Sequence, residues 1–464
     1  MAQEKTLKQT QEKPKLERAL GLKEASALNM IDMVGIGPFI VIPLIIRAMN
    51  GPQCILAWLV GALLALIDGT VWAELGAAMP EAGGSYAFLK RIYNPNSWGK
   101  LLSFLFIWQT LIQAPLVVAS GAIGFSQYAS YIIPLGDLQK KMVSGAIVLL
   151  LTFLLYRKID SVGKISLFLW AGVIGTIVWI IVGGATHFNP KLAFDYAVPS
   201  GATSWILFAG LGQATIKTVY SYLGYYNVCH LGSEIKDPGR IIPKSIYISV
   251  IGIALLYIAM QLSVLGVIPW REAQNSQFIY STFIERLYGT SAATFATALI
   301  LWVAFSSLFA VMLGYSRIPY AAAVDGAFFA PFAKVHPTKH FPHVSLLALA
   351  AAGFCFSLLF RLSEVISAIL AMRIIVQFIG QAVGVILWHR KNPRASRPFS
   401  MWLFPVPAVL AIGAWAWLFS AIEWKFQVAG LSVIVAGILL YLIRAQRKSE
   451  WPFADRVKLS ENIA

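Results

Sequence analysis

Residues 26–48 read SALNMIDMVGIGPFIVIPLIIRA, an apolar run that is interrupted at its middle by Val34-Gly35-Ile36-Gly37-Pro38. A helix of about 20 apolar residues spans the hydrocarbon core of a bilayer. Glycine weakens a helix, and Pro38 has no N–H group to donate to the carbonyl of Val34. We therefore expect either a membrane-spanning helix that breaks into two halves, or a kink at which neighbouring helices restore the lost hydrogen bonds.

Apolar runs of similar length recur along the whole chain. Its 464 residues are 58% hydrophobic and only 12% charged, and the mean hydropathy is +0.70. A soluble domain carries about twice that fraction of charge. We expect an all-α membrane protein with twelve transmembrane helices. The predicted spans are 26–48, 53–79, 98–132, 141–156, 164–186, 203–231, 243–268, 291–319, 342–360, 364–389, 401–420 and 426–444.

The loops between these spans differ in positive charge. Of the 37 Lys and Arg residues, 27 fall on the side of the N-terminus and 8 on the opposite side, while Lys217 and Arg373 fall inside spans. Positive charge marks the cytoplasmic side. This predicts a multi-pass protein of the cytoplasmic (inner) membrane with both termini, 1–24 and 445–464, as cytoplasmic tails. The N-terminal tail lacks the apolar region of a signal peptide.

Several function classes find no support in the composition. The net charge of +16 is spread between apolar runs and forms no basic stripe with aromatic residues, so we expect no nucleic-acid partner. Cys54, Cys229 and Cys355 match no metal spacing or disulfide pattern, and the six His residues are scattered. Catalytic and nucleotide motifs are absent from the sequence, so we expect neither an enzyme, nor a bound metal, nor a cofactor.

A second interruption, Ser221-Tyr222-Leu223-Gly224-Tyr225, lies in the sixth predicted span. Spans one and six correspond if the core, 25–389, consists of two inverted five-helix halves, about 25–186 and 203–389, with helices eleven and twelve following at 390–444. Paired breaks at corresponding positions indicate a transporter with a binding site at the membrane midplane. Free N–H groups at a half-helix can bind a carboxylate, and unwound carbonyls can bind an ammonium group or a cation.

At these residues the chain resembles the amino acid–polyamine–organocation superfamily of LeuT-like 5+5 transporters, most closely the bacterial and L-type amino acid transporters. The resemblance is carried by Leu28-Asn29 with 34–39, by 72–86 (WAELGAAMPEAGGSY), by 221–227 (SYLGYYN) with 234–238 (EIKDP), and by 316–320 (SRIPY) with Asp325-Gly326 and His336-Pro337. It implies secondary active transport of an amino acid by alternating access. The alternatives are an amino acid exchanger, a polyamine or organocation transporter, and a non-transporting nutrient sensor.

The resemblance also implies a set of substrate-binding residues in the two breaks. The substrate amino group would meet carbonyls of Met33, Tyr220, Ser221 and Leu223, and its carboxylate would meet N–H groups of Ile36 and Gly37. Gly35 and Gly224 would let the main chain approach the substrate closely. Phe39, Tyr222 and Tyr225 are candidate gate or side-chain-pocket residues, and core packing is the alternative reading for each.

Five charged residues fall inside spans, where a charge usually faces a cavity or a partner. They are Asp32, Asp68, Glu74, Lys217 and Arg373. We expect Glu74 to pair with a basic residue of a loop. Lys217 and Arg373 could pair with Asp32 or Asp68, or bind an acidic side chain of the substrate.

The resemblance leaves the coupling ion open between H⁺ and Na⁺. Proton-coupled relatives carry a Lys in helix five, whereas residues 169–173 here contain none, and Lys217 could take over that protonatable role. Ser306 and Ser307 lie where sodium-coupled relatives place hydroxyl ligands, although a Ser pair in a membrane helix often bonds to its own preceding turn. The loop 131–142 has no Cys, so no disulfide-linked partner subunit is expected.

Overall fold

The computed structural model describes residues 16–196, 204–359, 362–393 and 397–453, and within these ranges the chain is helical, with only two isolated β-bridges. The twelve predicted spans correspond to twelve helical segments. In chain order these are α2 (Leu22–Met33) with α3 (Gly37–Met49), α4 (Ile55–Ala78), α6 (Trp98–Ile132), α7 (Asp137–Leu155), α8 (Ile159–Thr186), α10 (Ser204–Tyr222) with α11 (Asn227–His230), α12 (Pro238–Val267), α15 (Thr290–Tyr315), α17 (His343–Leu359), α18 (Leu362–Arg373) with η4 (Ile374–Ile379) and α19 (Gly380–Lys391), α20 (Val406–Ala421), and α21 (Trp424–Arg447). The expected all-α membrane fold is confirmed.

Shorter helices join these segments. They are η1 (Pro52–Cys54), α5 (Ser85–Ile92), α9 (Pro190–Ala193), η2 (Gly232–Glu234), α13 (Trp270–Ala273), α14 (Ile279–Tyr288), α16 (Arg317–Val324) and η3 (Ala330–Ala333). The eighth span was expected to run to residue 319, but α15 ends at Tyr315 and a new helix, α16, begins at Arg317. Pro319 then lies in the first turn of α16, where its missing N–H group costs no hydrogen bond.

Both predicted helix breaks are present. The helices α2 and α3 are bent by 45° at the break between Met33 and Gly37, which is more than a kink. In the sixth span, α10 ends at Tyr222 and α11 begins at Asn227. Gly224 between them has a φ of +119°, and a Cβ atom there would lie 2.8 Å from the backbone of Asp32. The absence of a side chain at Gly224 thus lets the second break pack directly on the first.

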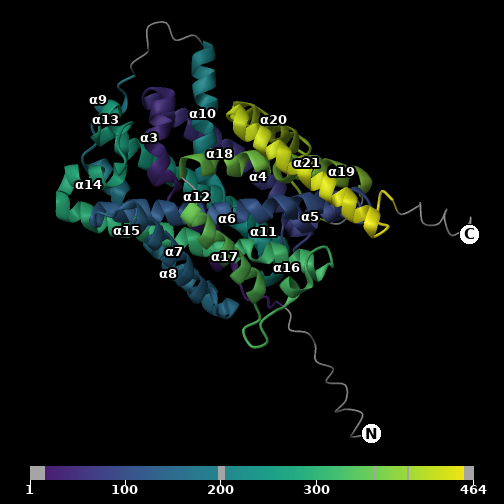
Figure 1. Cartoon of the computed structure of the whole chain (residues 1–464). Helices are drawn as coiled ribbons and strands as arrows, with labels where there is room; N and C mark the ends of the chain where they lie inside the picture. Colours follow the sequence, from purple (N-terminus) through teal and green to yellow (C-terminus); the bar gives the residue numbers. More distant parts are fainter. Residues whose placement is uncertain (1–15, 197–203, 360–361, 394–396, 454–464) are drawn as a thin grey trace, which may run out of the picture.

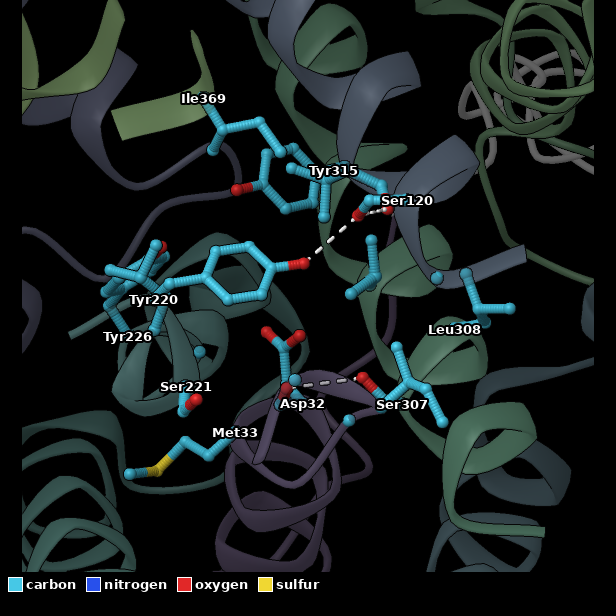
Figure 2. Close-up of a pocket in the computed structure, with 18 of the residues that line it drawn as sticks. Asp32, Met33, Ser120, Tyr220, Ser221, Tyr226, Ser307, Leu308, Tyr315 and Ile369 are labelled. Atoms are coloured by element: carbon cyan, nitrogen blue, oxygen red, sulfur yellow. Dashed lines mark hydrogen bonds between the residues drawn. The ribbon is translucent and has the colours of Figure 1, made fainter. Parts of the chain in front are cut away.

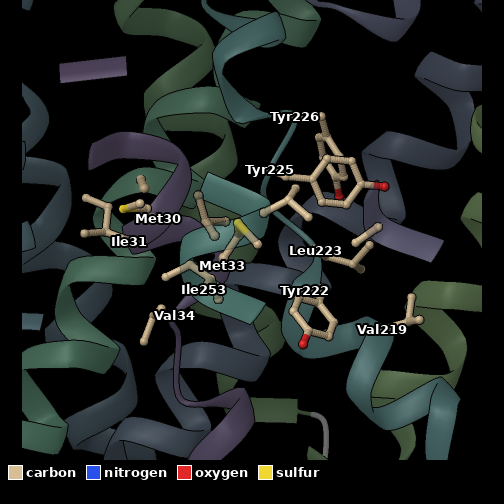
Figure 3. Packing of buried hydrophobic residues seen from close by; sticks show 14 of the residues in the cluster. Met30, Ile31, Met33, Val34, Val219, Tyr222, Leu223, Tyr225, Tyr226 and Ile253 are labelled. Carbon is tan, nitrogen blue, oxygen red and sulfur yellow. The ribbon is translucent and has the colours of Figure 1, made fainter. Parts of the chain in front are cut away.

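Figure 3 shows this packing from the side of the apolar residues. Met33 and Val34 of the first break and Tyr222 and Leu223 of the second all belong to this buried cluster. The two interruptions therefore form one joint at the centre of the bundle.

The remaining helices surround this joint. The long helix α6 crosses the middle of the molecule, while α20 and α21 lie along one edge, where α20 packs against α4 and α21 packs against α18 (Figure 1). The division of the core into two inverted five-helix repeats, 25–186 and 203–389, stays a prediction.

Candidate functional site

A cavity of about 60 Å³ lies where the two breaks meet (Figure 2). Of the predicted substrate-binding residues, all but Tyr222 line it: Met33, Gly35, Ile36, Gly37, Tyr220, Ser221, Leu223 and Gly224. Of the predicted coupling or gating residues, Asp32, Ser307 and Arg373 line it, whereas Lys217 and Ser306 do not. The remaining lining residues come from α6, α15, α18 and Tyr226 after the second break.

Residues of both breaks line the cavity, and three of them, Gly35, Gly37 and Gly224, can do so only through their main chain. Because α3 begins at Gly37, the N–H groups of Ile36 and Gly37 precede its first intrahelical hydrogen bond. The single O–H group of Tyr257 is shared between the carbonyls of Met33 and Ser221, at 2.7 and 3.1 Å. A carbonyl oxygen has two lone pairs, so each can accept a second donor. No feature of the sequence indicated a role for Tyr257, which lies in the middle of α12.

The two glycines of the first break differ in the space around them. A Cβ atom on Gly35 would lie 2.6 Å from Oγ of Ser307, which is closer than van der Waals contact permits. A Cβ atom on Gly37 would lie 3.3 Å from the ring of Tyr220, a tight but less severe contact. The close approach of α15 to the first break therefore depends on Gly35, whereas Gly37 gives α10 a smaller amount of space there.

A carboxyl group and a guanidinium group line the same cavity. The Asp32 carboxylate points into it, toward the ring of Tyr220 (Figure 2). Arg373, at the end of α18, is only 2% exposed, and its guanidinium donates to Gln377 Oε1 at 3.1 Å and to the hydroxyl of Tyr315. Among the described residues Arg373 forms no ion pair with a carboxylate, although Asp32 lines the same cavity.

Aromatic rings hold the Arg373 guanidinium in place. It lies 5.3 Å from the ring centre of Tyr226 and 5.4 Å from that of Tyr315, within the range of cation–π attraction. The π-helical turn η4 follows immediately and carries Gln377, the hydrogen-bond partner of Arg373. Turns of this kind are frequent at functional sites. No feature of the sequence had indicated this turn.

Among the described residues, the ion pairs left open as alternatives for Lys217 and Asp68 do not form. Lys217 does not pair with Asp32 or Asp68, and its ammonium donates to the carbonyl of Gln213 at 3.0 Å, one turn back along α10. Asp68 accepts hydrogen bonds from the hydroxyl of Tyr225 at 2.5 Å and from the indole of Trp415 at 3.0 Å, so neutral donors satisfy it.

Glu74 has the basic partners that the sequence predicted. Its carboxylate lies 3.6 Å from Nε of Arg397, in the loop before α20, and contacts His389 at the end of α19. The backbone N–H of Met401 donates to it at 2.9 Å. Glu74 therefore connects the ends of α4 and α19 with the loop before α20, outside the cavity.

The three aromatic residues for which gating and core packing were both open pack in the core in this structure. The hydroxyl of Tyr222 donates to the carbonyl of Trp58 at 3.3 Å, and Tyr225 is occupied by Asp68. Phe39 packs edge-on against Tyr280, with ring centres 5.0 Å apart. The side chain that does lie over the cavity is Tyr220, whose hydroxyl is 3.2 Å from Oγ of Ser120 (Figure 2).

The two serines of α15 have different surroundings. Ser306 donates to the carbonyl of Trp302 at 2.7 Å, the bond to the preceding turn that was the alternative to an ion-binding role. Ser307 lines the cavity and donates to the carbonyl of Asp32 at 3.3 Å. Only Ser307 is thus placed to contact a bound species.

A second cavity of about 830 Å³ lies one helical turn beyond the first. It is lined by residues 40, 123, 216 and 366, which stand three or four positions from residues 36, 120, 220 and 369 of the central cavity. Lys217 lines this larger cavity. The hydrogen bond between Tyr220 and Ser120 lies at the level that separates the two cavities.

The opposite end of the central cavity is closed by several contacts. Arg317 and Glu234 form a buried bidentate ion pair, with distances of 2.9 and 2.7 Å. Leu20, before α2, makes a parallel β-bridge to Ile235, and Ala82 makes an antiparallel bridge to Leu231. The segments before α2, after α4 and after α11 are therefore connected to one another at this end.

The profile of the amino acid permease family matches residues 20–443, nearly the whole chain. The chain belongs to the amino acid permease family. Members of this family are transporters rather than enzymes, and the profile covers both helix breaks and every residue of the central cavity.

Three relatives illustrate the range of the family. The serine/threonine exchanger SteT of Bacillus subtilis is 24% identical over 447 residues, covering 94% of this chain and 98% of the relative. The branched-chain amino acid permease BcaP of the same organism is 23% identical over 457 residues, covering 94% of each. The methylthioribose transporter of Bacillus subtilis is 22% identical over 464 residues, covering 96% of this chain and 97% of the relative.

Proposed function

We propose that this permease is a secondary active transporter that carries a zwitterionic amino acid across the inner membrane by alternating access. The observation that carries the proposal is the central cavity, where the N–H groups at the start of α3 and two opposite side-chain charges face the same small space. The 27-to-8 distribution of Lys and Arg supports an orientation with both termini in the cytoplasm.

The charges in the cavity suit a substrate that carries both signs. A buried charge without a counter-charge costs several kcal/mol. A bound zwitterion would supply an ammonium group to Asp32 and a carboxylate to Arg373 or to the N–H groups of Ile36 and Gly37. If Arg373 takes a second carboxylate, the substrate has an acidic side chain. If Arg373 takes the α-carboxylate, the substrate side chain is neutral.

The two ends of the cavity support alternating access. One helical turn, with the Tyr220–Ser120 contact, separates the substrate site from the larger cavity, which in the proposed orientation opens toward the outside. The Arg317–Glu234 pair and the two β-bridges close the cytoplasmic end. Transport then requires these contacts to open while the outer turn closes.

The coupling ion belongs to this proposal as well. Ser307 and the carbonyl of Asp32 could contribute to a sodium site beside the cavity, since both present oxygen atoms there. Lys217 lines the outer cavity, where it could exchange a proton with water. The two ideas predict opposite outcomes when the sodium and pH gradients are varied separately.

The test is uptake by purified protein in proteoliposomes, screened with the twenty amino acids, putrescine and methylthioribose. Each is measured with a pH gradient, with a sodium gradient, with neither, and with vesicles preloaded with unlabelled substrate. Uptake of an amino acid into empty vesicles supports the proposal, and uptake only into preloaded vesicles identifies an exchanger. Binding without flux for every compound would contradict transport and favour a sensor. Loss of the pH response in Lys217→Ala, with exchange retained, would assign proton coupling to Lys217.

A further inference from the structure

A groove on the periphery of the helix bundle combines an apolar wall with a basic end. Its volume is about 780 Å³, and it lies between α7, the start of α8 and the start of α17 with the loop before it. It shares no residue with the central cavity or with the larger cavity next to it. The transport proposal therefore gives it no role.

The apolar wall faces away from the helix bundle. Phe153 is 71% exposed, Leu149 is 58% exposed, and Leu347 on the neighbouring helix α17 is 46% exposed. In a membrane protein such outward-facing side chains meet lipid acyl chains. An acyl chain can therefore lie along this wall, and the specific question is which headgroup it carries.

The other end of the groove is lined by three cations. Arg157 and Lys158 are exposed in the turn between α7 and α8, and Lys339 approaches from the loop before α17. The Lys339 ammonium is held in place, since it donates to the carbonyl of Tyr156 at 3.0 Å and lies 4.5 Å from the centre of that ring. The position of the third cation is thus fixed by the fold.

Negative charge is missing from this lining. None of the ten residues that line the groove is Asp or Glu, and the carboxylate nearest in sequence, Asp160, does not line it. Basic clusters beside a membrane helix attract anionic lipid headgroups. In the orientation proposed above, this end lies in the cytoplasmic leaflet, beside other positively charged loops.

We infer that this groove binds an anionic phospholipid, with one acyl chain along Leu149, Phe153 and Leu347 and the phosphate among Arg157, Lys158 and Lys339. The groove is of a size that holds small-molecule ligands. Tyr156 lies between the two regions, at the level where aromatic side chains meet the interface. The binding goes beyond transport and does not depend on it, so a failed uptake assay leaves it standing.

The test is native mass spectrometry of the full-length protein with dioleoyl phosphatidylglycerol and dioleoyl phosphatidylcholine in equal amounts. Each Lys or Arg near an anionic surface strengthens binding roughly fivefold. We expect the parent protein to retain more phosphatidylglycerol than phosphatidylcholine. In the triple variant Arg157→Gln, Lys158→Gln, Lys339→Gln the ratio of the two bound lipids should fall by about tenfold or more. The matched control, Arg240→Gln, Arg390→Gln, Lys391→Gln, removes the same charge from the same end and should keep it.

Three outcomes would overturn the inference. One is equal retention of the two lipids by the parent, and another is an equal loss of preference in the two triple variants. The third is displacement of phosphatidylglycerol by glycerol phosphate at a similar concentration, which would indicate a site for a free anion with no acyl chain. If the triple variant does not fold, Lys339→Gln and Arg157→Gln are measured singly against Arg390→Gln, and each should lose preference about fivefold.

Discussion

Toward Lys217 the central cavity is separated from open space by one helical turn and one hydrogen bond between side chains, that of Tyr220 with Ser120. Toward Glu234 it is closed by a buried bidentate ion pair and two β-bridges that tie segments far apart in sequence. The first closure consists of this hydrogen bond and the packing of Tyr220 against a small apolar cluster that includes Ile369. The second requires several elements to separate together, so we expect the two closures to respond very differently to single substitutions.

The largest effect is expected at the second closure, the one formed by Arg317 and Glu234. Arg317→Gln leaves Glu234 buried without a counter-charge, which costs about 3–5 kcal/mol. The protein should melt at a clearly lower temperature, measured by thermal denaturation in detergent. The matched control is Arg91→Gln at the same end, because Arg91 pairs with the exposed Glu81 and such pairs contribute at most about 1 kcal/mol.

A double variant sharpens this prediction. Replacing both partners, Arg317→Met with Glu234→Gln, removes the uncompensated charge and should recover most of the stability. It should still impair transport, because the two segments lose their specific connection. Equal melting temperatures for Arg317→Gln and Arg91→Gln would show that the buried pair does not hold this end closed.

The next effect concerns the charge between the two closures. Arg373→Gln keeps a hydrogen-bonding side chain next to Tyr315 and Gln377 but removes the positive charge. A hydrogen bond to a charged group contributes about 1.5–3 kcal/mol, so substrate affinity should fall about 10- to 150-fold. Arg373→Lys keeps the charge and should retain more of it. Normal affinity in a folded Arg373→Gln protein would remove Arg373 from the binding site.

A smaller effect is expected from crowding at the first break. Gly35→Ala places a Cβ atom 2.6 Å from Oγ of Ser307, whereas Gly37→Ala places one 3.3 Å from the Tyr220 ring. Overpacking costs about 1–3 kcal/mol, so Gly35→Ala should reduce uptake about tenfold and Gly37→Ala less. Adding Ser307→Ala removes the clashing oxygen and should rescue Gly35→Ala in part. Equal losses at the two glycines, without rescue, would contradict the observed packing.

The smallest effect is expected at the first closure, the one formed by Tyr220 and Ser120. Tyr220→Phe removes only the hydroxyl that contacts Ser120, a change worth about 1 kcal/mol. A cysteine placed in the cavity at Ser221 should then react a few times faster with a water-soluble thiol reagent added from the outer side. Tyr222→Phe is the control, because its hydroxyl bonds to Trp58 outside the cavity. Identical rates in the two variants would mean that Tyr220 does not limit access.

The sequence predicted the joint of the two breaks well, because a helix break is a local property. Gly and Pro weaken a helix wherever they stand, so 34–38 and 221–225 were identifiable without knowing their neighbours. Arg373 was noticeable as a charge within an apolar span. These features needed only the chain's own periodicity and residue chemistry.

The rest of the site depends on how helices are rotated and which ones meet. Tyr220 lies over the cavity while Tyr222, two positions on, faces Trp58, and only the orientation of α10 decides between them. Ser120 and Tyr315 come from α6 and α15, far from either break in sequence. The position of Lys217, one turn before Ser221, places it in the outer cavity rather than beside Asp32, so the ion pair that was one of the open alternatives does not form.

The most direct measurement is substrate protection of Ser221→Cys compared with Tyr222→Cys, in a protein lacking Cys54, Cys229 and the exposed Cys355. Ser221 lines the cavity and its neighbour Tyr222 does not. If the joint of the two breaks is the substrate site, the cysteine at position 221 reacts with a water-soluble thiol reagent and saturating substrate slows that reaction, while the cysteine at 222 stays unreactive throughout. A reaction at 221 that proceeds at the same rate with and without substrate would contradict a binding site at this joint.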